Sequence, residues 1–157
     1  MLKVDMTLAE ALRDVARTRM RHEALVCSGA RLTYGQLLER TEALAVGLHG
    51  RGIGKGDRIA CLLPPSAEHA TLFFAAALLG AVLVPINPQA RPRQLNDVLA
   101  DAQPAMLIAA QPPAPEVQVP PGTLVVQAGP SAPAGSAFEE LLASGSGPLP
   151  EQGVAPG

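Results

Sequence analysis

Residues 56–88, GDRIACLLPPSAEHATLFFAAALLGAVLVPINP, decide the fold of this chain. Residues 58–63 form a short apolar run after a glycine-rich turn, which is typical of a strand buried on both faces of a sheet. A helix is predicted next, because Ser66 is a good N-cap and Gly80 suits a left-handed C-terminal cap. A second apolar run, residues 81–86, follows the glycine. The connection is long enough for a crossover between parallel strands, so this stretch predicts a right-handed βαβ unit.

Two capping boxes predict helices before this unit. Thr7 with Glu10 opens a helix over about residues 7–21, and Thr33 with Gln36 opens a second helix that ends at the glycines of positions 50, 52 and 54. Short apolar runs elsewhere continue the alternation of strands and helices. They predict a hairpin from residues 24–28 and 31–33, a helix over 91–102, strands over 105–109 and 123–127, and a helical turn or two over 138–143.

Composition indicates an ordered protein rather than a disordered one. The chain has 157 residues, is 48% hydrophobic and carries a formal net charge of −2. All 12 Lys and Arg residues lie within residues 1–93 and form no basic cluster, so the sequence predicts no nucleic-acid partner. Cys27 and Cys61 each lie in an apolar run, which favours buried, reduced thiols in a cytoplasmic protein.

The uncharged run from residue 70 to residue 90 is long enough to span a bilayer. However, Gly80 divides it into a helix-length piece and a strand-length piece, and Pro85 and Pro88 interrupt it further. A helix that is apolar on all sides is also typical of the core of an α/β protein. The sequence therefore predicts no membrane span, and a membrane-associated helical protein remains as an alternative.

Several motifs, in the same order along the chain, resemble one protein family, the AMP-forming acyl-CoA synthetases of the adenylate-forming superfamily. The resemblance is to the N-terminal region of that family and covers about residues 7–109. Its motifs are Leu32 to Leu37, Gly56-Asp57-Arg58, Pro64 to Glu68, Phe73-Phe74-Ala75, Gly80-Ala81-Val82, Val84-Pro85-Ile86-Asn87-Pro88 and residues 95–108. One residue departs from the family pattern, and one segment narrows the match within the superfamily. Pro65 stands where the family often has Asn, and the short link 87–95 is more similar to acyl-CoA synthetases than to peptide-synthetase adenylation domains.

The resemblance implies an α/β fold, namely a partial N-terminal subdomain of the adenylate-forming fold. Its sheet is expected to be mainly parallel, with flanking helices and a small N-terminal hairpin. Residues 1–109 form this subdomain, and residues 110–143 form a proline-rich connection with one further strand and a short helix. Residues 144–157 are rich in Gly, Ser and Pro, which predicts a disordered tail.

The same resemblance implies the activity of the complete enzyme and its place in fatty acid metabolism. A carboxylic acid, ATP and coenzyme A are expected to give an acyl-CoA through an acyl-adenylate, with magnesium. The family binds ATP with a Ser/Thr/Gly-rich loop that ends in Lys, whereas the lysines here are Lys3 and Lys55 and no Lys, Arg or His follows Arg93. Residues 144–147 imitate that loop in composition alone, because no Lys and no helix follow them. We therefore expect no catalytic, cofactor-binding or metal-binding residue in this chain.

Other polar residues suggest structural roles. His22, His49 and His69 are widely spaced, and no Cys, Asp or Glu lies at ligand spacing to complete a metal site. His69 lies near the start of the predicted buried helix, where a structural histidine is favoured over a substrate contact. Asp57 and Arg58 stand where a turn becomes a strand, and we expect them to anchor the strand through hydrogen bonds to the backbone.

The interpretation is an N-terminal fragment of an acyl-CoA synthetase that is inactive alone. Its expected partner is the remainder of the ligase or a complementing chain. The alternative is a complete small non-catalytic interaction module, or one half of a split ligase, that docks a partner through the face left bare by the missing sheet. Either way, the buried-type helix over residues 67–79 and the central strands predict a large exposed apolar patch.

Overall fold

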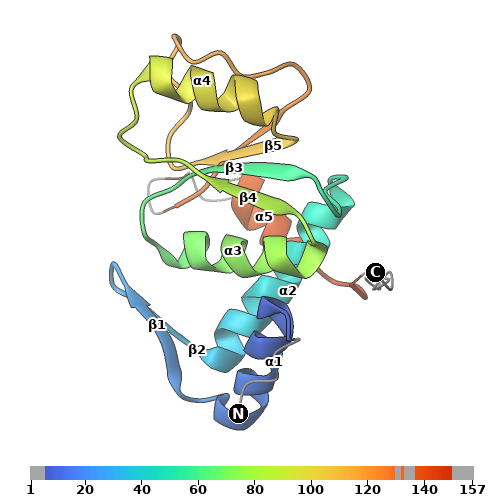
Figure 1. The fold of residues 1–157 in the computed structure, drawn as a ribbon. Helices are drawn as coiled ribbons and strands as arrows, with labels where there is room; N and C mark the ends of the chain where they lie inside the picture. The colour runs from blue at the N-terminus through green and yellow to red at the C-terminus, as the bar shows by residue number, and fades with distance from the viewer. Residues whose placement is uncertain (1–5, 130–131, 133–136, 150–157) are drawn as a thin grey trace.

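The computed structural model describes residues 6–129, 132 and 137–149 (Figure 1). Helices and strands alternate along most of it, as the apolar runs predict. In chain order the elements are α1 (Leu8–Arg19), β1 (Glu23–Cys27), β2 (Ala30–Thr33), α2 (Tyr34–Gly50), β3 (Arg58–Leu62), α3 (Ala67–Leu79), β4 (Val82–Pro85), α4 (Pro92–Ala102), β5 (Met106–Ala109), β6 (Leu124–Gln127) and α5 (Ala137–Ala143).

The central sheet has the strand order β4-β3-β5-β6, and all three pairings are parallel. Ile59 of β3 lies beside Leu83 of β4 and Met106 of β5, so the first strand of the predicted βαβ unit is internal to the sheet. β1 and β2 pair antiparallel as a separate hairpin. The predicted α/β class, the parallel sheet and the N-terminal hairpin are all confirmed.

Helices cover both faces of the sheet, as Figure 1 shows with α4 on one side and α3 on the other. On the α3 face, α2, α3 and α5 bury a large apolar core against the sheet, with Leu44, Leu72 and Phe138 at its centre. On the α4 face, Leu95 and Leu99 pack on Ala60 and Leu107. The proline-rich connection follows this second face, because Asn96 of α4 donates to the carbonyl of Glu116 (3.1 Å) and accepts from the N–H of Gln118 (2.7 Å).

The helix caps are those that the sequence predicts. Thr7 and Thr33 each form both halves of a capping box, and Ser66 accepts a hydrogen bond from the N–H of His69 at 3.2 Å. Gly80 ends α3 in the left-handed conformation with φ 67°, which a residue without a Cβ adopts at little cost. The uncharged run therefore divides at Gly80 into a helix and a strand. Among the described residues, no helix is both long and apolar enough to cross a bilayer.

Asp57 and Arg58 anchor the entrance of β3, which confirms their predicted role. Asp57 Oδ2 accepts the N–H of Gly54 at 2.8 Å and so closes the turn before the strand. Arg58 Nη1 donates to the carbonyl of Ala102 at 3.0 Å, at the C-terminal end of α4. A cation is favourable there because the last carbonyls of a helix carry partial negative charge. One adjacent pair thus ties a turn and a distant helix to the central strand.

The segment after α5, which includes the start of the tail expected over residues 144–157, packs against α2 at Gly145. A Cβ built on Gly145 would fall 2.0 Å from the carbonyl oxygen of Ala43, and one built on Gly47 would fall 2.0 Å from that of Leu141. Two glycines therefore let α5 and the following turn lie directly on the backbone of α2. Of the residues expected to form the tail, 144–149 are described and 150–157 lie outside the described part of the chain.

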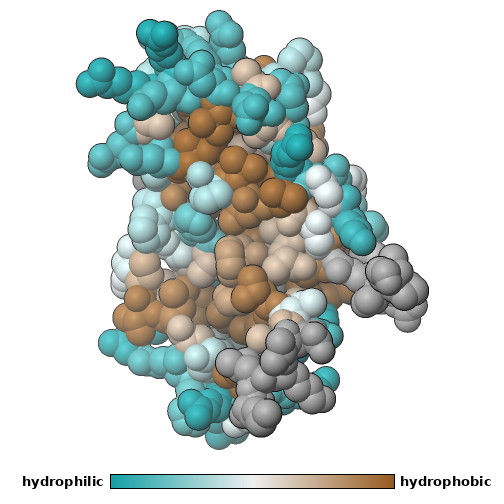
Figure 2. All heavy atoms as spheres, in the orientation of Figure 1, coloured by the Kyte–Doolittle hydropathy of each residue, from teal (hydrophilic) through white to brown (hydrophobic). Residues whose placement is uncertain are grey.

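Apolar side chains also gather on the surface. Figure 2 shows them across the face that β4 and α3 occupy in Figure 1. Val82 of β4 is 48% exposed and Phe73 of α3 is 42% exposed. The predicted exposed apolar patch is therefore present on this side of the molecule.

Candidate functional site

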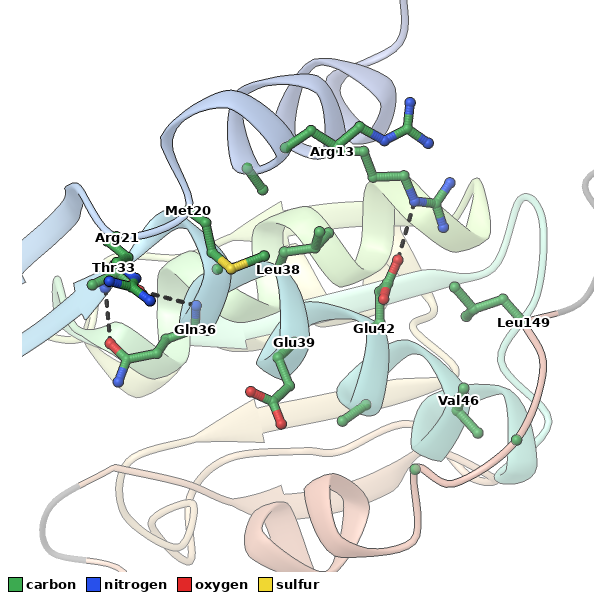
Figure 3. A pocket seen from close by; sticks show the side chains of 16 residues that line it. Arg13, Met20, Arg21, Thr33, Gln36, Leu38, Glu39, Glu42, Val46 and Leu149 are labelled. Atoms are coloured by element: carbon green, nitrogen blue, oxygen red, sulfur yellow. Dashed lines mark hydrogen bonds and ion pairs between the residues drawn. The ribbon is translucent and has the colours of Figure 1, made fainter.

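A groove of about 1020 Å³ lies between α1, α2 and the turn after α5 (Figure 3). Its lining is part charged and part apolar. Charged and polar residues are Arg13, Arg17, Arg21, Thr33, Gln36, Glu39 and Glu42, and the rest are Ala16, Met20, Gly35, Leu38, Ala43, Val46, Gly145, Gly147 and Leu149. The close contact of Gly145 with α2 shapes one end of this groove.

Three arginines of the groove recur every four residues, so they follow one face of α1 and the residues after it. Arg13 Nε donates to Glu42 Oε1 of α2 at 3.1 Å, which bridges the two walls. Within the described structure, Arg17 and Arg21 have no carboxylate at ion-pair distance. The lining therefore carries three arginines and two glutamates, of which Arg13 and Glu42 form an ion pair.

Apolar side chains line the groove beside the charged ones. In Figure 3, Met20 and Leu38 lie toward one end, and Val46 and Leu149 lie toward the other. Guanidinium groups next to apolar side chains can bind a group that is anionic at one end and apolar elsewhere, although Glu39 and Glu42 lie in the same lining. The groove lining offers no free nucleophile or histidine base for catalysis. The lining contains no Cys or His, and its single hydroxyl, on Thr33, accepts the N–H of Gln36 at 3.2 Å as a helix cap.

A smaller hollow of about 490 Å³ adjoins α2 on the side of α5. Arg40, Glu39 and Glu139 line it together with apolar residues. Arg40 Nε is buried and has no hydrogen-bond partner among the described residues. Because two carboxylates line the hollow with this one arginine, its charge does not favour an anion.

The residues that the sequence singled out do not come together as a catalytic site. The backbone N–H of His69 belongs to the cap of α3, and Asp57 and Arg58 bind backbone atoms. Burial raises the pKa of the Cys61 thiol to about 11, which keeps it protonated and unreactive at neutral pH. Cys27, which the sequence predicted to be buried, is only partly buried. Its thiol donates to the carbonyl of Pro65 at 3.3 Å.

The side chains that could bind a metal are dispersed over the described part of the chain. No three His, Cys, Asp or Glu side chains there lie close enough to hold a metal ion. Residues 144–147, which imitate a phosphate loop in composition, lie after α5, and the described residues that follow them, up to residue 149, form no helix. Gly145 packs against the backbone of Ala43. Sequence reasoning missed the arginine groove, although the spacing of four between Arg13, Arg17 and Arg21 is visible in the sequence.

Comparison with known proteins shows which family this chain resembles in sequence. The sequence profile of the family described as AMP-binding enzyme matches residues 12–154. The long-chain-fatty-acid–CoA ligase FadD13 of Mycobacterium tuberculosis is 37% identical over 121 residues, which is 72% of this chain and 24% of that ligase. The olefin beta-lactone synthetase of Stenotrophomonas maltophilia is 38% identical over 113 residues, 64% of this chain and 20% of the synthetase.

Solved structures agree with the sequence comparison. The N-terminal subdomain of Klebsiella oxytoca NpsA, in complex with anthranilyl-AMSN, superposes with a TM-score of 0.74 over 92% of this chain and 34% of that one, at 24% identity. VinN superposes with a TM-score of 0.67 over 69% of this chain and 29% of its own, at 31% identity. This chain spans about a quarter of FadD13 and about a fifth of the olefin beta-lactone synthetase.

Proposed function

This chain belongs to the family of AMP-binding enzymes, and we propose that it forms the N-terminal part of an acyl-CoA ligase. The ligase as a whole converts a carboxylic acid, ATP and coenzyme A into an acyl-CoA through an acyl-adenylate. The observation that carries the proposal is the 37% identity with FadD13 over 121 residues, within a family match of residues 12–154. The names of the relatives, which include further acyl-CoA ligases, favour acyl transfer to coenzyme A.

In this proposal the chain supplies a sheet and its covering helices, and the rest of the ligase supplies the nucleotide site. A bound triphosphate needs cations and well-placed N–H donors. The lysines are Lys3 and Lys55, and no Lys, Arg or His follows Arg93. ATP, magnesium and coenzyme A are therefore assigned to the remainder of the enzyme, and the part described here is inactive alone.

We further propose that the ligase acts in fatty acid metabolism in the cytoplasm. The fatty-acid ligase name of FadD13 supports the first statement. Two unpaired cysteines support the second, because disulfides are rare in reducing compartments. The partner of this chain is the remainder of the ligase, in the same polypeptide or as a complementing chain.

A chimera tests the proposed function. Residues 12–154 replace the matching segment of FadD13, and the formation of acyl-CoA from a long-chain fatty acid, ATP and coenzyme A is measured beside unaltered FadD13. We expect the folded chimera to form acyl-CoA, and FadD13 that lacks the segment to form none. A chimera that unfolds cooperatively but makes no acyl-adenylate and no acyl-CoA would contradict the proposal.

A further inference from the structure

The charged side chains of the groove between α1 and α2 do not cancel one another. Three arginines and two glutamates line it, and Arg13 pairs with Glu42 at 3.1 Å. Arg17, Arg21 and Glu39 form no ion pair with another described residue. The described lining therefore carries one positive charge in excess, which a ligand with a single negative charge complements.

Apolar side chains extend from the arginines toward the other end of the groove. In Figure 3, Arg21 lies at the same end as Met20 and Leu38, and Val46 and Leu149 lie toward the opposite end. The groove volume of about 1020 Å³ is at the upper end of the range for small-molecule sites, which is roughly 300 to 1,000 Å³. An alkyl chain can therefore lie along the apolar side chains while a charged end stays beside the arginines.

One part of the groove wall carries no side chain. Gly145 and Gly147 both line the groove, and a Cβ built on Gly147 would meet nothing within 4 Å. The wall at Gly147 therefore borders open space, and a ligand can lie there without any movement of the backbone. The same position accepts a larger residue that would fill the groove.

We propose that this groove binds the anion of a free fatty acid, with its carboxylate at Arg17 and Arg21 and its alkyl chain along the apolar lining. A planar guanidinium donates two parallel N–H groups to a carboxylate, which favours arginine over lysine for this head group. Leu38, Val46 and Leu149 are half-buried in the groove, so a single molecule reaches them and a flat bilayer surface does not. The inference goes beyond the proposed function and does not depend on it, because this site uses neither ATP nor coenzyme A.

Calorimetric titration of chain 1–157 with dodecanoate tests the site, with the ligand kept below the concentration at which it aggregates. We expect saturable binding of one molecule per chain. Dodecanol has the same alkyl chain without the charge, and acetate has the charge without the chain. Each should bind at least about tenfold more weakly than dodecanoate, because each lacks one half of the interaction.

Charge variants test the position of the carboxylate. Arg17→Gln should weaken dodecanoate binding at least about tenfold, because it removes a charged hydrogen-bond donor. Glu39→Gln should tighten binding about two- to fivefold, because it removes a like charge from the lining. Arg19→Gln is the matched control: Arg19 lies on α1, forms no ion pair with a described residue and is not part of the lining, so the change should stay below about twofold.

A steric variant tests the path of the alkyl chain. Gly147→Phe fills open space in the groove and should weaken dodecanoate binding at least about tenfold. Gly50→Phe is the matched control, because a Cβ at Gly50 also meets nothing within 4 Å and Gly50 does not line the groove. Its effect on binding should stay below about twofold. Urea unfolding of both variants verifies that each is folded.

Vesicles distinguish a free acid from a membrane surface as the source of the anion. We expect chain 1–157 to sediment equally little with phosphatidylcholine vesicles and with vesicles that also contain phosphatidylglycerol. Sedimentation that requires phosphatidylglycerol and that Arg17→Gln abolishes would assign the groove to an anionic membrane and overturn the proposal. The absence of dodecanoate binding, equal binding of dodecanol, or equal losses in Arg17→Gln and Arg19→Gln would overturn it as well. An inactive FadD13 chimera beside a chain that binds dodecanoate contradicts the proposed function alone.

Discussion

Gly145 lies directly on the backbone of Ala43 in α2, where a Cβ on the glycine would come within 2.0 Å of the Ala43 carbonyl oxygen. A second close approach, Gly47 to Leu141, lies on the same side of α2. Together they hold α5 and the turn after it against the second helix. A stretch whose composition imitates a phosphate loop is therefore part of the packing of this structure and forms one end of the arginine groove.

Gly145→Ala should lower the free energy of unfolding by about 1–3 kcal/mol, because the backbone of α2 must move to admit the methyl group. Urea denaturation of chain 1–157 measures the loss. Gly147→Ala is the matched control, since a Cβ there meets nothing within 4 Å and its effect should stay within about 0.5 kcal/mol. Equal stability of the two variants would show that the contact with Ala43 does not exist in solution.

Arg58→Met should cost about 1–2 kcal/mol of stability, because it removes the charged hydrogen bond to the carbonyl of Ala102 at the end of α4. Arg31→Met is the control. Arg31 pairs with Glu23 on the hairpin with 67% of its side chain exposed, so its loss should cost less than about 0.5 kcal/mol. Thermal or urea unfolding of both variants checks the difference, and a larger loss for Arg31→Met would contradict it.

Cys61 should make the protein less stable as the pH rises from about 9 to about 11. Burial raises the pKa of this thiol from 9.0 to about 11 in the folded chain, so the unfolded chain releases its proton first. The stability is fully present below pH 9 and is lost as the pH approaches the folded pKa, by at most about 3 kcal/mol.

Urea unfolding at several pH values, for the native chain and for Cys61→Ala and Cys27→Ala, isolates this effect from other titrating groups. Only Cys61→Ala should show a shallower decline above pH 9. A thiol reagent at pH 8 should label Cys27, which is partly exposed, well before Cys61, which is fully buried. Labelling of both cysteines at one rate would mean that β3 opens more readily than the structure indicates.

Features encoded by neighbouring residues were predictable from the sequence. Thr7, Thr33, Ser66 and Gly80 each act within one helical turn, so their caps are found where the residue types place them. The parallel sheet was also predictable, because long connections between apolar runs exclude hairpins. Arg58 was predicted to bind backbone atoms, although the sequence does not show that the acceptor belongs to α4.

Features that depend on how distant elements meet were not predictable. Cys27 and Cys61 lie in similar apolar runs, yet Cys61 lies in an internal strand of the sheet and Cys27 in a two-stranded hairpin that leaves it partly exposed. Glycine in a Gly/Ser-rich stretch signals flexibility in isolation, and only the approach of α5 to α2 gives Gly145 its packing role. The arginine groove likewise requires α1 to lie on α2.

The central claim is that this chain carries part of the scaffold of an AMP-binding ligase without its nucleotide site, and a thermal melt with MgATP tests it most directly. A ligand at a hundredfold excess over its dissociation constant stabilises the folded form by about 2.7 kcal/mol, which a melt detects readily. Chain 1–157 should show no saturable rise with millimolar MgATP, whereas the FadD13 chimera should show one. A saturable rise in the isolated chain would contradict the account, and its loss in a Gly145 and Gly147 double substitution would place the nucleotide on the turn after α5.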